Sequence, residues 1–171
     1  MDQAAAHRLV FAMLDADGDG VVSRDEYLAR TTHAARAVGR EEDDPLVVTA
    51  RALGARAWAS MDADGDGRMT FDEYTAWAGA EAFDTICAPL LGALFDLADT
   101  DGDGTLDLAE FTTFRTALNN PADNAEAAFT ILDPQGTGRV RRADYVASIR
   151  SHVTGGNSPM GEALYGGVPV A

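Results

Sequence analysis

The sequence of 171 residues contains no lysine, so arginine supplies all 13 of its basic side chains. Against these 13 bases stand 28 acids, which give the chain a formal net charge of −15. A surface of this charge repels the phosphates of nucleic acids and of anionic membranes, so we expect neither as a partner. The surplus of carboxylates favours a partner of positive charge instead.

Cysteine and long apolar runs are also scarce. Cys87 is the only cysteine, which excludes an intrachain disulfide, and its apolar neighbours predict a buried, unreactive thiol. No uncharged apolar stretch approaches the ~18 residues that a membrane span needs, and the first residues lack the pattern of a secretory signal. Hydrophobic residues nevertheless make up 46% of the chain, which is enough for a packed core. We therefore expect a cytoplasmic, soluble protein and a monomer.

One short acidic pattern occurs three times in full and once in a degenerate form. The full copies begin at Asp15, Asp62 and Asp99 and read D-x-D-G-D-G, whereas the copy that begins at Asp133 reads D-P-Q-G-T-G. Each copy has an aromatic residue four positions before it, an apolar residue at its eighth position, and an aromatic residue just after its twelfth. In that order these are Phe11, Trp58, Phe95 and Phe129; Val22, Met69, Leu106 and Val140; and Tyr27, Tyr74, Phe111 and Tyr145. Such a regular context indicates one structural unit repeated four times.

The segments that flank each copy are predicted to be helices. Before the first copy, apolar residues from Leu9 to Leu14 recur at helical spacing. After it, Ser23 is a residue type that caps helices, and the acids that follow favour a helix start. The apolar eighth position suits a short strand that pairs with a neighbouring copy. The sequence therefore predicts an all-α fold of four helix–loop–helix units in two packed pairs, with short β-bridges between the paired loops.

Three of the four loops have the chemistry of a calcium site. Ca²⁺ takes six to eight oxygens, and a twelve-residue loop can supply them from positions 1, 3, 5, 7, 9 and 12, with glycine at position 6 for the sharp turn. A closing glutamate that gives two oxygens favours Ca²⁺ over octahedral Mg²⁺, which remains a competitor. The predicted ligands are Asp15, Asp17, Asp19, the Val21 carbonyl and Glu26; Asp62, Asp64, Asp66, the Arg68 carbonyl and Glu73; and Asp99, Asp101, Asp103, the Thr105 carbonyl and Glu110. We therefore predict three bound Ca²⁺ ions.

The loop at residues 133–144 departs from this chemistry. Gln135 and Thr137 stand at positions 3 and 5, Arg141 stands at position 9, and Asp144 is one methylene shorter than the usual closing glutamate. Lost carboxylates and added positive charge both oppose a divalent ion. We expect this loop to hold no ion and to serve as the structural partner of the third loop.

The loops at 15–26, 62–73 and 99–110 resemble the EF-hand pattern, and the loop at 133–144 resembles a degenerate EF-hand. Four such hands, with a long segment between the first two, are similar to the sarcoplasmic calcium-binding proteins and their bacterial relative calerythrin. The resemblance implies a compact all-α fold whose two lobes pack together. It also implies cytosolic calcium buffering or signalling.

This organisation divides the chain into three parts. We assign residues 1–82 to a first pair of hands, 83–150 to a second pair, and 151–171 to an apolar tail that contains glycine and proline. The acidic segment that ends at Pro45 is predicted to be a solvated connector between two helices, and residues 79–84 a short junction between the pairs.

Three classes of function remain to be weighed. A calcium buffer is favoured, because the chain has few methionines for a target groove and no long charged tether between its pairs. A sensor that exposes a groove to a protein target is the alternative, and Leu164, Tyr165 and Val168 of the tail could fill such a groove in the resting state. An enzyme is not expected, because His7, His33 and His152 are far apart in sequence and no phosphate-binding loop is present.

Overall fold

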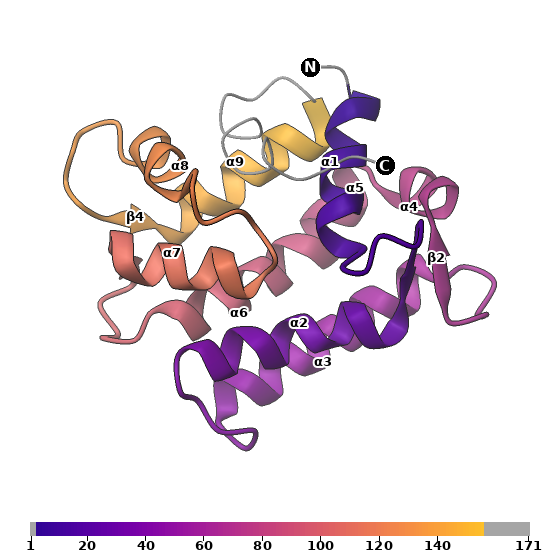
Figure 1. Ribbon diagram of the computed structural model, residues 1–171, viewed down its shortest axis with the longest axis horizontal. Helices are drawn as coiled ribbons and strands as arrows, with labels where there is room; N and C mark the ends of the chain where they lie inside the picture. The colour runs from indigo at the N-terminus through magenta and orange to yellow at the C-terminus, as the bar shows by residue number, and fades with distance from the viewer. Residues whose placement is uncertain (1–2, 156–171) are drawn as a thin grey trace.

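Each of the four predicted units forms a helix, a loop and a second helix (Figure 1). The structure is a computed structural model that describes residues 3–155, so the predicted packing of Leu164, Tyr165 and Val168 lies outside the described residues. The all-α prediction is confirmed. The elements are α1 (Gln3–Leu14), β1 (Val21–Ser23), α2 (Arg24–Ala37), α3 (Pro45–Met61), β2 (Arg68–Thr70), α4 (Phe71–Trp77), α5 (Ala80–Ala82), η1 (Phe83–Cys87), α6 (Ala88–Ala98), β3 (Thr105–Leu106), α7 (Leu108–Ala117), α8 (Ala125–Leu132), β4 (Val140–Arg141) and α9 (Arg142–Gly155).

The short strands pair the loops two by two, as predicted. Strand β1 lies antiparallel to β2, and β3 lies antiparallel to β4. The register places Val22 opposite Met69 and Leu106 opposite Val140. All four of these side chains are fully buried, at 0% exposure. Each bridge therefore joins two loops through backbone hydrogen bonds, and contacts between its buried apolar side chains stabilise it.

The repeated aromatic residues hold each pair together in the same way. The aromatic residue before one loop packs against the aromatic residue after the partner loop, in both directions and in both pairs. The ring centroids are 5.9 Å apart for Phe11 and Tyr74, 5.7 Å for Tyr27 and Trp58, 5.8 Å for Phe95 and Tyr145, and 5.6 Å for Phe111 and Phe129. These are ordinary distances for favourable aromatic pairs. The eight aromatic residues identified in the sequence therefore hold the two hands of each pair together.

The two pairs also pack against each other around one continuous core. Figure 1 shows α9 beside α1, and the α2–α3 hairpin running below α6. The corresponding helix contacts are α1 with α9, α3 with α6 and α2 with α7. His7 of α1 donates a hydrogen bond from Nε2 to the carbonyl of Val153 in α9 (2.9 Å). The first and last described helices are thus fastened together, which brings hand one beside hand four.

The junction between the pairs is short and is mostly helical. Helix α4 ends at Trp77, the chain bends by 81°, and a helical run follows from Ala80 to Ala98. Its middle turn, η1, is a π-helix that ends two residues before Pro89, whose ring nitrogen cannot donate a helical hydrogen bond. The division at residue 82 falls inside this run and stays a prediction.

The connector between hands one and two has the predicted character. Helix α3 begins at Pro45, and the carboxylate of Asp44 accepts a hydrogen bond from Leu46 N at 2.8 Å. Residues 41–43 are exposed. Among residues 3–155, no single helix is long and apolar enough to cross a membrane, and only the sharply bent α4 with Ala80–Ala98 meets the criteria of length and composition.

Candidate metal centre

Glycine at position 6 lets each loop turn sharply enough to bring its carboxylates together. Gly20, Gly67 and Gly104 have φ angles of 90°, 81° and 82°. A Cβ atom at any of these glycines would meet no neighbour within 4 Å, so the requirement lies in the backbone angle rather than in space. Any other residue type would be strained there. The predicted role of these glycines is therefore met by the local geometry.

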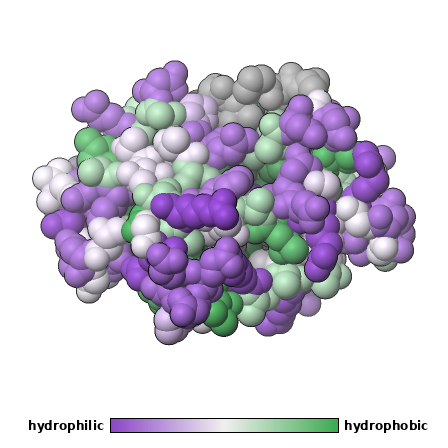
Figure 2. Space-filling view, turned by 60° about the horizontal axis from the view of Figure 1, so that its bottom comes forward, coloured by the Kyte–Doolittle hydropathy of each residue, from purple (hydrophilic) through white to green (hydrophobic). Residues whose placement is uncertain are grey.

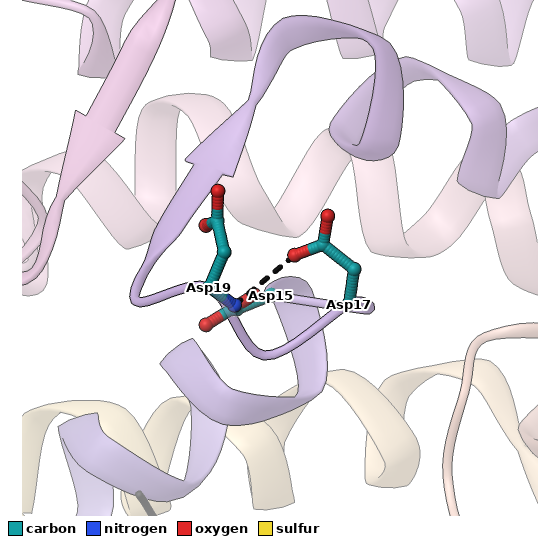
Figure 3. A group of neighbouring side chains, drawn as sticks. All are labelled: Asp15, Asp17 and Asp19. Carbon is teal, nitrogen blue, oxygen red and sulfur yellow. Dashed lines mark hydrogen bonds between the residues drawn. The ribbon is translucent and has the colours of Figure 1, made fainter.

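In the loop at 15–26 (loop one), the aspartates at positions 1, 3 and 5 converge. One carboxylate oxygen from each of Asp15, Asp17 and Asp19 lies within 4.8 Å of the other two. Figure 3 shows the three side chains around the turn, with the hydrogen bond from Asp19 N to Asp17 Oδ1 (3.1 Å) that shapes it. Asp15 Oδ2 accepts a further hydrogen bond from Gly20 N at 3.0 Å. The backbone amides thus fix the position of the carboxylates.

The loop at 62–73 (loop two) repeats this arrangement and adds a buried acceptor without a donor. Asp62, Asp64 and Asp66 form the cluster, again within 4.8 Å. Asp62 Oδ2 accepts from Gly67 N at 3.1 Å, but Asp62 Oδ1 is buried and has no hydrogen-bond partner. A buried carboxylate oxygen is costly unless something positive lies against it. This oxygen fits a cation held by the loop.

The closing glutamates are held in place by the helices that follow the loops. In each of the exit helices α2, α4 and α7, the residue at loop position 9 is the N-cap and the glutamate at position 12 completes a capping box. Glu26 Oε2, for example, accepts from Ser23 N at 2.8 Å and from Ser23 Oγ at 2.7 Å. Partial burial acts to raise the pKa of Glu26, but the hydrogen bonds from Ser23, Asp17 and Ala16 together outweigh it and hold the pKa below its usual value. Glu26 is therefore ionised and aimed at the loop.

The loop at 99–110 (loop three) brings together a different set. Its cluster consists of Asp99, Asp101 and Glu110, and Asp103 is not part of it. Asp103 Oδ1 accepts hydrogen bonds from Thr105 N at 2.8 Å and Thr105 Oγ1 at 2.5 Å, and Oδ2 lies 3.4 Å from Arg139 Nη1. The Thr105 hydroxyl, with smaller help from the Thr105 amide and Arg139, holds the pKa of Asp103 below its usual value. Asp103, the fifth-position ligand of loop three, is therefore ionised and bound to its neighbours.

The loop at 133–144 (loop four) satisfies its remaining acids internally. Asp133 accepts hydrogen bonds from Thr137 N, Thr137 Oγ1 and Gly138 N at 2.9, 2.9 and 2.6 Å. Asp144 Oδ2 lies 2.7 Å from Arg141 Nε. In the part of the chain that the structure describes, no cluster of three metal-ligating side chains falls in this loop. An arginine at position 9 has only donors, so it cannot accept the hydrogen bond that caps the other exit helices.

Three arginines contribute to the loops in ways that the sequence analysis did not identify. Arg68 of loop two reaches Asp19 of loop one. Arg139 of loop four reaches Asp103 of loop three. Arg40, in the connector, donates from Nε to the Leu97 carbonyl (3.1 Å) and from Nη2 to the Asp99 carbonyl (3.2 Å) at the start of loop three. For Arg68 and Arg139 a sequence signal existed, because an arginine stands at position 7 of loops two and four. For Arg40 no local signal existed.

Among the remaining titratable candidates, Cys87 is partly buried, and His7 and His152 are buried. Burial raises the pKa of the Cys87 thiol to about 12, against a smaller opposing effect of Arg30, which agrees with the predicted unreactive thiol. His7 and His152, far apart in sequence, are both buried near the α1–α9 contact. Burial, and then the proximity of His7, lower the pKa of His152 to about 4. His152 is therefore neutral near pH 7.

Comparison with known proteins agrees with the loop geometry. A profile of the EF-hand domain pair matches residues 4–79 and 90–150. The fold is similar to that of a Streptomyces coelicolor calcium-binding protein described in terms of prokaryotic calcium-mediated regulation. That protein is 25% identical with a TM-score of 0.76, over 90% of this chain and 98% of the other. None of the curated proteins compared with this chain matches it by sequence.

Photoproteins share the same fold. The Ca²⁺-regulated photoprotein mitrocomin from the jellyfish Mitrocoma cellularia is 22% identical with a TM-score of 0.77, over 98% of this chain and 90% of the other. Mg²⁺-loaded apo-berovin, a ctenophore photoprotein whose three Ca²⁺-binding loops all bind Mg²⁺, is 21% identical with a TM-score of 0.65, over 86% of each chain. These two similarities support the assignment of the fold and nothing further. Together with the matched profile, the geometry identifies three acidic loops that fit Ca²⁺.

Proposed function

This chain belongs to the EF-hand domain-pair family and is a calcium-binding protein, and from that premise we propose that it acts as a cytoplasmic, monomeric calcium buffer. In this proposal loops one, two and three each hold one Ca²⁺ and loop four holds none. The carboxylates at positions 1, 3, 5 and 12 and the position-7 carbonyl would bind each ion. The proposed ligands are those predicted from the sequence, from Asp15 to Glu26, Asp62 to Glu73 and Asp99 to Glu110.

The observation that carries the buffer role is that the apolar surfaces of the two pairs already cover each other. A sensor must present a groove to its target, whereas a buffer changes shape little. In residues 3–155 the large hydrophobic side chains that are exposed are Val48, Leu108 and Ile131, which lie on three different helices. Figure 2 shows one face on which hydrophilic and hydrophobic side chains are intermixed. Three separate apolar side chains do not make a docking groove.

Polar contacts also hold the first pair of hands against the second. Arg40 of the first pair donates from Nε to the Leu97 carbonyl and from Nη2 to the Asp99 carbonyl of the second pair, at 3.1 and 3.2 Å. Asn119, after α7, donates from Nδ2 to the Met13 carbonyl in α1 at 3.4 Å. A Ca²⁺-driven opening would have to break these contacts and expose core side chains. This cost favours binding without opening.

The test compares the calcium-free and calcium-loaded protein by fluorescence of an apolar dye and by small-angle scattering. A buffer gives the same dye signal and the same radius of gyration in both states. A calcium-dependent rise in dye binding would contradict the buffer role and favour a sensor. The matched control carries Glu26→Gln, Glu73→Gln and Glu110→Gln, which removes the closing carboxylates, so any change it still shows does not come from the loops.

A calcium sensor is the second candidate function, and one specific likeness favours it. The Streptomyces coelicolor relative is described in terms of calcium-mediated regulation, and it aligns over nearly its whole length. Under this proposal a protein target would bind a surface that opens when the loops fill. Mg²⁺ is the expected competitor, since all three calcium loops of the similar photoprotein berovin bind it. We propose no enzymatic activity for this chain.

A further inference from the structure

The two pairs of hands share a contact that crosses from one loop to the other. In each pair, the arginine at position 7 of the second loop reaches the aspartate at position 5 of the first loop. Arg68 Nη2 lies 3.6 Å from Asp19 Oδ2, and Arg139 Nη1 lies 3.4 Å from Asp103 Oδ2. The same geometry thus occurs twice, independently, in the two halves of the molecule.

The β-bridge explains why position 7 can make this contact. The antiparallel register places Arg68, at position 7, opposite Ser23, at position 9 of the partner loop. In the second pair Leu106 lies opposite Val140, so Arg139 follows on towards Asp107, and Arg139 Nη1 is 4.0 Å from Asp107 Oδ2. A long side chain at position 7 therefore projects over the acids of the other loop.

The contact is much more extensive in the second pair. Arg68 has one ion-pair partner in loop one, Asp19, and Asp19 remains in the cluster with Asp15 and Asp17. Arg139 lies within 4.0 Å of three carboxylates of loop three, those of Asp101, Asp103 and Asp107. In loop three the position-5 aspartate lies outside the cluster. The arginine and the Thr105 hydroxyl together occupy the carboxylate that the ion needs.

We propose that Arg139 is an internal counter-ion of loop three, which neutralises the acids of the calcium-free loop and must give up Asp103 when Ca²⁺ binds. Loop three has five acids at its ligand positions, so it carries the strongest repulsion in the absence of an ion. Loop four, which has lost its own ligands, then regulates its partner by lending it a positive charge. Arg139 makes loop three bind Ca²⁺ more weakly, and Arg68 does the same to a smaller degree for loop one. The inference rests on the proposed assignment of one Ca²⁺ to loop three.

The size of the effect follows from exposure. The Arg139 side chain is 41% exposed, so water and salt screen its interaction with the acids and with an arriving ion. Removing one positive charge at this distance should strengthen Ca²⁺ binding at loop three by about three- to tenfold at low salt. High salt should reduce the gain, because the Debye length falls to roughly 3 Å at 1 M salt.

The experiment follows each loop separately in the full chain by NMR titration with Ca²⁺, through the backbone amides of Gly20, Gly67 and Gly104. Arg139→Gln is compared with Arg141→Gln, which removes the same charge from the same loop but from a side chain that pairs with Asp144. We expect Arg139→Gln to tighten binding at Gly104 about three- to tenfold, and Arg141→Gln to change it less than about twofold. The gain should shrink at high salt.

The outcomes separate this inference from the calcium assignment. If the Gly104 amide does not respond to Ca²⁺ in the unmodified protein, loop three is not a site and the proposed function is wrong there. If it responds, but equally in all three proteins, Arg139 is not a counter-ion of the loop. Equal tightening by Arg139→Gln and Arg141→Gln would show an effect of net charge alone and would also overturn the proposal.

Discussion

The two pairs of hands share the same packing contacts and differ in the acidic side chains of their loops. In both pairs a two-stranded bridge buries two apolar side chains, and the aromatic residue before each loop meets the aromatic residue after its partner. The first pair has two acidic clusters, whereas the second has one cluster beside a loop whose acids are satisfied by threonine, glycine and arginine. Loop four has therefore kept the residues that pack and lost the residues that bind.

This difference shows that the packing role and the ligand role of a hand can be separated. Val140 and Phe129 support loop three whether or not loop four holds an ion, because their contacts are apolar and formed within the protein. The first pair, by contrast, should gain stability from Ca²⁺ in both of its loops if the proposed sites are correct, since a ligand that binds the folded state stabilises it. Variants that break one role and spare the other should therefore affect the two pairs differently.

The largest expected effect comes from the closing acids. Glu110→Gln should abolish tight binding at loop three and lower the number of bound Ca²⁺ ions by one, because the loop loses a charge and its two-oxygen ligand. Asp144→Asn, the same change in loop four, should leave the number unchanged. Isothermal titration calorimetry measures both, and a loss of one ion in Asp144→Asn would contradict the empty fourth loop.

Truncating an aromatic anchor should cost stability in both pairs, but Ca²⁺ should compensate only in the first. Trp58→Ala and Phe129→Ala each leave a cavity between two helices, at an expected cost of about 3–5 kcal/mol in the calcium-free protein. Excess Ca²⁺ should restore Trp58→Ala more fully, because in the proposed function hand two holds an ion and hand four holds none. Chemical denaturation with EDTA and with excess Ca²⁺ gives both values. If Ca²⁺ restored the stability of both variants equally, the proposed difference in ion binding between hands two and four would be wrong.

The contact that joins the pairs should weaken in acid. The pKa of His152 is lowered to about 4 in the folded protein, so its unfolded state binds more protons between pH 6.5 and 4. Stability is therefore complete above about pH 6.5 and falls as the pH decreases towards 4, by about 1–2 kcal/mol at pH 5. The measurement is denaturation in EDTA across this range.

Two variants isolate that effect from the titration of carboxylates. His152→Gln should flatten the pH dependence between pH 6.5 and 5, whereas His33→Gln, at an exposed position, should leave the profile unchanged. If His152→Gln retains the full profile, protonation of this histidine does not loosen the α1–α9 contact.

The smallest effect concerns the helix caps. Ser23→Ala removes the cap of α2 and should lower the stability of the calcium-free protein by about 1 kcal/mol. Arg141→Ser would give α9 an N-cap side chain that can accept a hydrogen bond, as the other exit helices have, and should raise stability by about 0.5–1 kcal/mol. Thermal unfolding in EDTA compares the two. A stabilising Ser23→Ala, or a destabilising Arg141→Ser, would contradict this reading of the exit helices.

Much of this architecture could be predicted because it is local and repeated. The spacing of Phe11, Val22 and Tyr27 around loop one reports a helix, a strand and a helix within a few residues of each other. The Ser23 and Glu26 positions predict the helix start and the closing ligand at once, because one capping box performs both tasks. Repetition then strengthens every such inference.

The contacts that could not be predicted depend on how distant segments pack. Arg40 reaches the Leu97 carbonyl, and His7 reaches the Val153 carbonyl, across separations that no local pattern records. Arg139 could be recognised as a nearby cation of loop four, but its place over loop three follows from the bridge register and the free rotation of a long side chain. The π-turn at the junction could not be predicted either, because such a turn has no simple sequence signature.

The central claim is that packing and binding have separated in the fourth hand, and the count of bound ions tests it most directly. Isothermal titration calorimetry of the full chain with Ca²⁺, after complete removal of metal, should give three ions per protein. Four ions of comparable affinity would contradict the account, because loop four would then bind with two acids and an arginine at position 9. Two ions or fewer would contradict it equally, because an intact acidic loop would then fail to bind.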